Sequence, residues 1–345
     1  MKSSNKKLER LVDNGLYTLY GETPDRKILH RIAFELAIIR ASDIPTHFMA
    51  FHDLALFLKS RNIPYVPIST SASAFVFYLL GMTFANPLPP HYHCPSCHSF
   101  LWDNSCKNGF DLPPRRCPCG QGYVRDGHDL AEESYWGVSL FEKEQESPCG
   151  FCIRIPKSVS QIVFDYVGHH PAQDVFTPVE HHEDSGNHHF GELLLRTGDD
   201  LPDESKSFCE HMPSEEIKQS LQKHLEIPGI ECLPNTFYEL IRAVGVSHSY
   251  TEWHGGDRET ILSIDTAALD EYFAHREDFY EWMGDKLTRR EIWEVSERIR
   301  KGRGMLPQIE EMIEAKWLVD YINGIYYLPS KSQSVEWLIA KAKLT

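Results

Sequence analysis

The sequence predicts an α+β protein that is mainly helical and contains a small zinc ribbon. Apolar residues recur every three or four positions through residues 1–60 and again from 214 onward, which is the period of helices with one buried face. Between these helical parts, four cysteines stand as two close pairs, a pattern typical of structural zinc sites. At 345 residues the chain is long enough for two or three small domains.

The composition is ordinary for a globular protein, with 41% hydrophobic and 25% charged residues. No apolar run approaches the roughly 18 residues of a membrane helix, and the first ten residues are not followed by the apolar stretch of a secretory signal. We therefore expect a cytoplasmic protein without membrane contact. The formal net charge of −15 repels nucleic-acid phosphates, so any contact with DNA must come from a local basic patch.

Three helices are expected within residues 1–60, and Thr46 is the predicted N-cap of the third. A hydroxyl-rich run at 69–73 then leads into an apolar helix at 75–80. Because Ser and Thr side chains accept hydrogen bonds from the first free N–H groups of a helix, we interpret these hydroxyls as helix caps.

The paired cysteines read Cys94-Pro-Ser-Cys97 and Cys117-Pro-Cys119, with 19 residues between the pairs. Zinc takes four thiolates in a tetrahedron, and a site with four sulfur ligands and no open position is structural. Buried or disulfide-bonded cysteines are the alternative, which a cytosolic setting disfavours. The second pair is one residue shorter than the usual knuckle, so other residues remain alternatives to Cys119. These are Cys106, His91, His93 and His98.

Two further groups of residues leave alternatives open. Cys149 and Cys152 form a C-x-x-C pair that could be redox-active or half of another metal site, but we favour two small apolar residues on a strand. Three His-His pairs lie between residues 169 and 189 among carboxylates, where they could bind a transition metal or form a solvated loop. These histidines are His169, His170, His181, His182, His188 and His189.

A series of short motifs carries a family resemblance. Residues 86–129 contain, in this order, N-P-L-P-P-H-Y, C-P-x-C, G-F-D-L-P, C-P-C-G and D-G-H-D. This order resembles the palm segment of the bacterial DNA polymerase III alpha chain of the PolC type, a C-family polymerase. The resemblance implies a zinc ribbon attached to a reduced polymerase-palm-like region, followed by a helical fingers-like region. The implied parts are a helical lead-in with the start of the palm at 1–85, the zinc ribbon at 86–137, a reduced palm-like segment with the histidine-rich loop at 138–210, and a helical fingers-like domain at 211–345.

The residues that the resemblance implies for catalysis are not found in this sequence. The family synthesises DNA on a DNA template, using magnesium ions that aspartates hold on the palm strands. Here no Asp or Glu occurs from Ser147 through Phe164, and Arg196 stands at the third aspartate position. Ile68 likewise replaces the arginine of the family's phosphate-binding loop. We therefore predict a catalytically inactive relative linked to DNA replication or repair.

Two catalytic alternatives remain open. The first is an active magnesium-dependent DNA polymerase that takes its carboxylates from other positions. The second is a metal-dependent enzyme built on the histidine-rich segment. The carboxylates available to the first alternative are Asp165, Asp174 and Glu192.

A basic run at the end of an expected helix is the best candidate for contact with nucleic acid. Four of the six residues from 298 to 303 are basic. Cations at a helix C-terminus are also favoured by the helix dipole, which is the alternative explanation. We predict a zinc-stabilised module that binds DNA through this patch or binds a protein partner of the replication machinery. The basic residues are Arg298, Arg300, Lys301 and Arg303.

Overall fold

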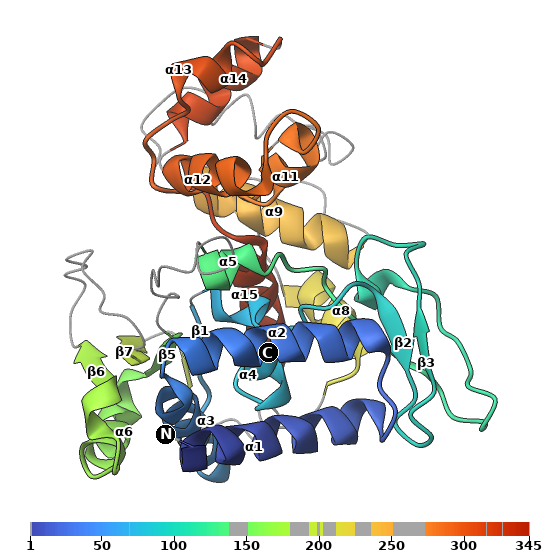
Figure 1. The fold of residues 1–345 in the computed structure, drawn as a ribbon, viewed down its shortest axis with the longest axis vertical. Coiled ribbons are helices and arrows are strands. Elements are labelled where there is room, and N and C mark those ends of the chain that lie inside the picture. The colour runs from blue at the N-terminus through green and yellow to red at the C-terminus, as the bar shows by residue number, and fades with distance from the viewer. Residues whose placement is uncertain are drawn as a thin grey trace. The chain divides into compact units, whose positions relative to one another are not determined.

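The computed structural model is mainly helical with two small sheets among its described residues (Figure 1), which confirms the predicted α+β class. The chain forms two compact units, one from Met1–Lys223 with Val335–Thr345 and one from His224–Ser334. None of the described helices has the length and apolar character needed to cross a membrane. The structure describes residues 2–68, 70–137, 151–179, 193–198, 201–202, 212–224, 236–250, 273–314, 316–325 and 327–344.

Three helices open the first unit, as the spacing of apolar residues predicts. Asp25 caps the second helix by accepting a hydrogen bond of 2.8 Å from the backbone N–H of Lys27. The third helix begins at Pro45 after Ile44, and no side chain caps it, so the prediction of Thr46 as N-cap is wrong. Proline begins this helix because its fixed φ already suits the first helical position. The helices are α1 (Lys2–Tyr20), α2 (Arg26–Ala41) and α3 (Pro45–Ser60).

A buried carboxylate caps the short helix α4 (Phe75–Leu79), in place of the hydroxyls predicted for this role. Glu35 of α2 accepts hydrogen bonds of 2.9 Å from the backbone N–H groups of Phe75 and Val76. Arg31 pairs with Glu35 at 2.6 Å and donates to the backbone carbonyl of Ser73. The hydroxyl interpretation is therefore wrong. Residues 70–73 form a buried 3-10 turn, and the N-cap residue itself is an alanine.

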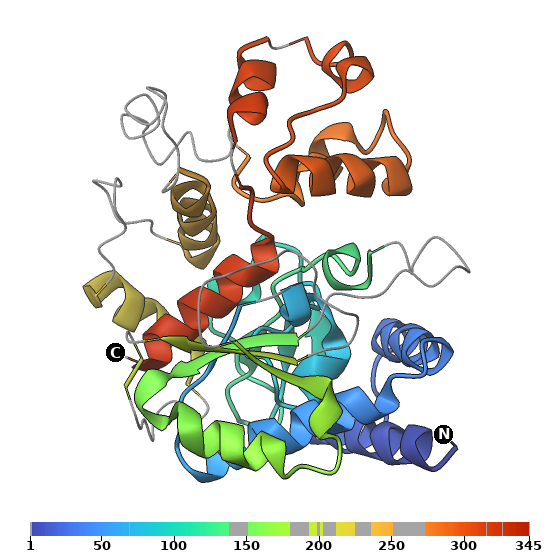
Figure 2. The same cartoon turned by 90° about the vertical axis from the view of Figure 1, so that its left-hand side faces the viewer.

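A four-stranded sheet follows, with the strand order β1-β5-β7-β6. Strand β5 pairs in parallel with β7 and antiparallel with β1, while β6 pairs in parallel with β7. Helix α6 lies beside this sheet in both views (Figures 1 and 2). The core next to strand β5 is aromatic, because the ring of Phe77 stacks on the rings of Phe48 and Phe151, with centroids 4.7 and 5.0 Å apart. The elements are β1 (Val66–Pro67), β5 (Phe151–Pro156), β6 (Phe176–Val179), β7 (Leu193–Gly198), α5 (Glu133–Trp136) and α6 (Ser160–Gly168).

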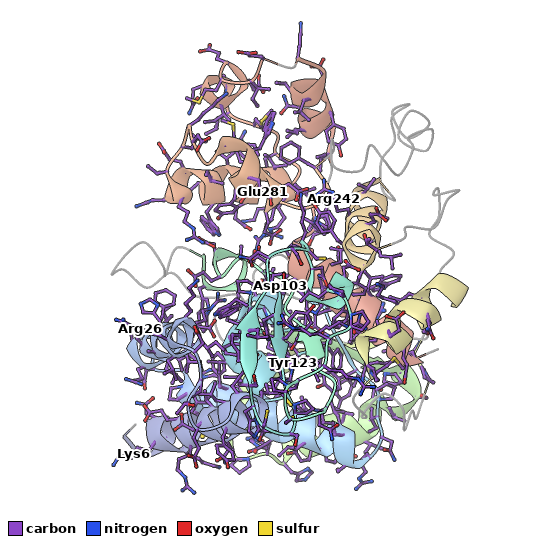
Figure 3. All side chains as sticks on the ribbon, turned by 90° about the vertical axis from the view of Figure 1, so that its right-hand side faces the viewer. Lys6, Arg26, Asp103, Tyr123, Arg242 and Glu281 are labelled. Carbon is purple, nitrogen blue, oxygen red and sulfur yellow. The ribbon has the colours of Figure 1, made fainter. Side chains whose placement is uncertain are left out.

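A second, three-stranded antiparallel sheet has the order β3-β2-β4, with a short 3-10 turn, η2, between β3 and β4. His91 of the central strand pairs with Trp102 on one side and with Asp126 on the other. Figure 3 labels Asp103, the residue that follows β3, and Tyr123, the residue that precedes β4. The elements are β2 (His91–His93), β3 (Phe100–Trp102), η2 (Gly109–Asp111) and β4 (Val124–Asp126).

The last helix returns to the first unit. Glu336 on this helix is fully buried, and one carboxylate oxygen accepts hydrogen bonds of 2.8 Å from the backbone N–H groups of Phe84 and Ala85. Burial raises the pKa of Glu336 to about 8, although the two N–H groups favour its charged form. The helices of this part are α8 (Ser214–His224) and α15 (Lys331–Leu344).

The second unit is helical in its described residues. Thr288 opens the amphipathic helix α12 through a capping box, in which Thr288 and Glu291 exchange side-chain-to-backbone hydrogen bonds. Arg242 pairs with Asp278 at 3.0 Å inside the unit. Burial raises the pKa of Asp278, against the opposing effect of that arginine. The helices are α9 (Phe237–Tyr250), α11 (Asp278–Met283), α12 (Arg289–Arg300), α13 (Pro307–Glu310) and α14 (Lys316–Gly324).

Candidate metal centre

Two tight backbone turns present the paired cysteines. Strand β2 runs into Cys94, where the N–H of His98 donates to the Cys94 carbonyl at 2.9 Å. In the second turn the N–H of Gly120 donates to the Cys117 carbonyl at 2.9 Å. Gly120 has φ +95°, and a Cβ there would meet no atom within 4 Å, so the requirement for glycine is one of backbone conformation.

The four predicted cysteines come together. Each offers one sulfur, and the four sulfurs all lie within 4.8 Å of one another. The closest cross-pairs are Cys94 with Cys119 and Cys97 with Cys117, each with sulfurs 3.4 Å apart. A zinc ion with bonds of about 2.3 Å needs sulfurs roughly 3.8 Å apart at tetrahedral corners. The four thiols are therefore close enough together to hold one metal ion.

The alternatives to Cys119 as a ligand lie outside the four-sulfur group. Cys106 donates its thiol hydrogen to the carbonyl of Asp111 at 3.4 Å. His98 lies at the tip of the first turn, with its ring 6.1 Å from that of Tyr17 on α1. His91 and His93 belong to strand β2 and lie in a separate polar cluster. Both cysteines of the shortened C-x-C pair, Cys117 and Cys119, therefore belong to the four-sulfur group.

That separate cluster is buried behind the metal centre and was not recognised as a unit from the sequence. Asn86 donates to a carboxylate oxygen of Asp126 at 2.6 Å and to the hydroxyl of Tyr20 at 2.9 Å. Tyr78 also donates to that carboxylate oxygen, at 3.0 Å. His91 Nδ1 donates to the carbonyl of Pro89 at 2.7 Å, which leaves Nε2 to accept from Tyr20 at 3.1 Å. The motif residues N-P-L-P-P-H-Y and D-G-H-D meet here as one hydrogen-bonded network.

The charge state of this network follows from burial. Burial opposes ionisation of Asp126, but the neighbouring His91, His93 and His128 rings hold its pKa below the ordinary value. Burial likewise lowers the pKa of His91 and raises that of Tyr20 well above its usual value. The hydrogen bond from Asn86 also favours the charged form of this carboxylate. The cluster therefore anchors the ribbon to α1 and α4.

The strands that carry the resemblance to the catalytic palm contain no carboxylate. The sequences are F-C-I-R-I-P in β5 and L-L-L-R-T-G in β7. The two strands are parallel neighbours, and their register places Arg154 opposite Arg196. Asp165 lies in helix α6 and Asp174 in a 3-10 turn, while Glu192 lies outside the described residues.

The histidine-rich segment is described only at its start. His170 pairs with Asp53 at 3.5 Å, and His169 donates from Nδ1 to the carbonyl of Asp165 at 2.7 Å. The pairs at 181–182 and 188–189 lie outside the described residues. Cys149 of the C-x-x-C pair also lies outside them, whereas Cys152 is buried on β5.

The predicted basic run ends α12 in the second unit, and two of its members have a carboxylate partner. Arg300 donates to Glu297 at 2.8 and 2.9 Å, and Lys301 lies 3.5 Å from the same carboxylate. Arg276 makes a further short contact with it. Although burial opposes ionisation, these cations hold the pKa of Glu297 at about 2. The two members outside this network are Arg298, which is half-buried, and Arg303, which is exposed.

A model of a known protein family matches most of the first unit. The family model described as the bacterial DNA polymerase III alpha NTPase domain matches residues 6–219. The chain belongs to the bacterial DNA polymerase III alpha family. The matched residues of this DNA polymerase III alpha relative include the ribbon, the buried cluster and the four-stranded sheet.

Curated relatives carry the name DNA polymerase III PolC-type. The protein of Streptococcus agalactiae serotype III is 37% identical over 124 residues, or 35% of this chain and 8% of the relative. That of Halalkalibacterium halodurans is 32% identical over 142 residues, or 40% of this chain and 10% of the relative. That of Thermotoga petrophila is 24% identical over 444 aligned positions, covering 93% of this chain and 32% of the relative. The chain thus spans 8% to 32% of the length of these three relatives.

Proposed function

We propose that this chain is a catalytically inactive relative of the PolC-type DNA polymerase III alpha chain. Its role is that of a zinc-stabilised module that binds nucleic acid or a protein partner in DNA replication. The family membership supplies the link to replication. The finer division into a zinc ribbon, a reduced palm and fingers-like helices belongs to the same proposal.

The register of β5 and β7, which places Arg154 opposite Arg196, carries the proposal. Nucleotidyl transfer needs two magnesium ions roughly 4 Å apart, held by carboxylates beside the reacting phosphate. Both parallel strands carry arginine at this register, and neither strand contains an Asp or Glu that could be a magnesium ligand. The internal carboxylate of Glu35 also occupies the N–H groups at the start of α4, the helix that follows the former phosphate loop.

Primer extension on the full-length protein tests the inactivity. We expect no nucleotide incorporation with magnesium or manganese, at any primer–template concentration up to saturation. A PolC-type relative assayed in parallel shows that the substrate is competent. Magnesium-dependent extension by this chain, abolished by the paired substitution Asp165→Asn and Asp174→Asn, would establish the active alternative and refute the proposal.

A DNA-binding titration at two salt concentrations tests the nucleic-acid part. Arg298→Ala with Arg303→Ala removes the two cations outside the Glu297 network, and Arg289→Ala with Arg290→Ala is the matched control at the other end of α12. If the run contacts phosphates, the first pair lowers affinity and reduces the salt slope by roughly 1.4 to 1.8, about 0.7–0.9 per contact. Equal effects of the two pairs would remove the basic run from the binding surface and leave a protein partner as the remaining role.

A further inference from the structure

The four-sulfur group combines exposed and buried cysteines in a regular way. Cys97 and Cys119 are exposed, whereas Cys94 and Cys117 are buried. The sulfurs of Cys94 and Cys119 lie 3.4 Å apart, and so do those of Cys97 and Cys117. Each of these two cross-pairs therefore joins one cysteine that a small solute reaches from solvent to one that is buried behind it.

This arrangement suits a two-step oxidation by a peroxide. The exposed thiolate attacks one oxygen of hydrogen peroxide, the O–O bond breaks, hydroxide leaves, and the sulfur becomes a sulfenic acid. The thiolate of the buried partner then attacks that sulfur, the S–O bond breaks, a second hydroxide leaves, and a disulfide forms. Two thiolates thus lose two electrons in total, and one peroxide is reduced to two hydroxide ions.

The partner sulfur that completes each reaction is close at hand. A disulfide bond is about 2.05 Å long, so the two sulfurs of a cross-pair must approach each other by about 1.4 Å. The other two cysteines that the structure describes do not belong to the group. Cys106 donates its thiol hydrogen to the carbonyl of Asp111, and Cys152 is buried on β5.

Disulfides across the two turns are favoured over disulfides within each turn. Only one residue separates Cys117 from Cys119, and a ring that short strains the dihedral angle of about 90° that a disulfide prefers. The cross-pairs instead close long loops that contain β3 and η2. Since a longer loop restricts the unfolded chain more, these cross-links stabilise the folded ribbon more.

The anchor of the ribbon does not depend on the cysteines. Asn86 donates to Asp126 and to Tyr20, and Tyr78 donates to the same carboxylate, so these hydrogen bonds involve no sulfur. Oxidation of the four-sulfur group leaves them in place. The oxidised ribbon is then held by its buried cluster and by two covalent links, and it can return to the thiol form.

We propose that the four-sulfur group is a reversible oxidation site, at which a peroxide converts Cys97 with Cys117, and Cys94 with Cys119, into two disulfides. A metal ion needs thiolate ligands, so the same reaction releases any ion that the group holds. The release of zinc rests on the proposed function as a zinc-stabilised module, whereas the pairing of the cysteines rests on the positions of the four thiols.

Peptide mapping of the full-length protein tests the pairing. The zinc content is measured first, hydrogen peroxide is added, zinc release is followed with a chromogenic chelator, and free thiols are alkylated in denaturant. Trypsin cuts after Lys107 and Arg116, so a disulfide across the turns joins peptide 62–107 to peptide 117–125, whereas disulfides within the turns leave these two peptides separate. We expect the joined peptide, loss of zinc, and reversal of both by dithiothreitol with added zinc.

Three variants identify the partners. In Cys119→Ser the peptides should stay joined through Cys97 and Cys117, and the alkylated cysteine of the group should be Cys94. In Cys117→Ser they should stay joined through Cys94 and Cys119, with Cys97 alkylated. Cys106→Ser is the matched control and should form both disulfides, because Cys106 lies outside the four-sulfur group.

The outcomes separate this proposal from the proposed function. Separate peptides after oxidation, alkylation of the other cysteine in either variant, or oxidation that dithiothreitol does not reverse would each overturn the reversible site. If zinc is present and the joined peptide does not form, the zinc-stabilised module stands and the oxidation site is refuted. If zinc is absent and the joined peptide forms, the pairing is supported and the zinc part of the proposed function is refuted.

Discussion

Replacing Glu336 with glutamine should make the protein more stable at alkaline pH. The carboxylate is fully buried, its described hydrogen bonds come from two backbone N–H groups, and its pKa lies at about 8 against an ordinary value of 4.5. Since the folded state holds the proton more tightly than the unfolded state, the stability contributed by protonated Glu336 is fully present below pH 4.5 and is lost as pH rises through 8. Glutamine keeps the acceptor oxygen, has the shape of the protonated acid, and cannot ionise.

The magnitude follows from the two pKa values. At about 1.36 kcal/mol for each pKa unit, the full cost of ionising the buried acid reaches roughly 5 kcal/mol at high pH. Over the range from pH 6 to pH 8, the stability difference between Glu336→Gln and the wild type should grow by roughly 2 kcal/mol in favour of the variant. Urea denaturation of the full-length protein, followed at several pH values and fitted with a common slope, measures this difference.

Glu35→Gln provides the contrast. Glu35 accepts from two backbone N–H groups in the same way, but Arg31 pairs with it at 2.6 Å. Removing its charge leaves a part-buried arginine without that partner, so this variant should be destabilised by about 3 kcal/mol. A difference between Glu336→Gln and the wild type that stays constant from pH 6 to pH 8, or that moves in favour of the wild type, would refute the reasoning.

The remaining predictions concern the ribbon. Cys119→Ser should reduce the bound zinc and lower the melting temperature, whereas Cys106→Ser should retain the metal, because only Cys119 belongs to the four-sulfur group. Metal analysis and a thermal melt of each variant measure these effects. Equal zinc contents in the two variants would contradict the assignment. Gly109→Ala should cost about 3 kcal/mol or more, since its Cβ would lie 1.8 Å from the carbonyl oxygen of Asp126. Gly122→Ala, where a Cβ meets no atom within 4 Å, is the control and should be near neutral in the same melt.

Features that depend on neighbouring residues could be predicted from the sequence. The helical period and the two cysteine pairs are local patterns, and the structure places them accordingly. The pairing of Arg300 and Lys301 with Glu297 was also visible in principle, because residues three and four apart face each other on a helix. Because Glu297 already pairs with Arg300 and Lys301, these two cations are less available to the phosphates of DNA.

Features that depend on distant residues could not be predicted in this way. The cap of α4 comes from Glu35, 40 residues before the N–H group of Phe75. The carboxylate that holds Phe84 comes from Glu336, 252 residues later. Local propensity assigns such caps to nearby hydroxyls, because pairing between remote segments leaves no periodic signal in one sequence.

The return of the chain to its first unit has a consequence for shortened versions of the protein. Because the first unit consists of Met1–Lys223 and Val335–Thr345, residues 224–334 are an insertion within it. A version that stops at Lys223 would lose α15, and the N–H groups of Phe84 and Ala85 would lose their acceptor. To isolate the first unit, the excision must be internal, with a flexible linker joining Lys223 to Val335.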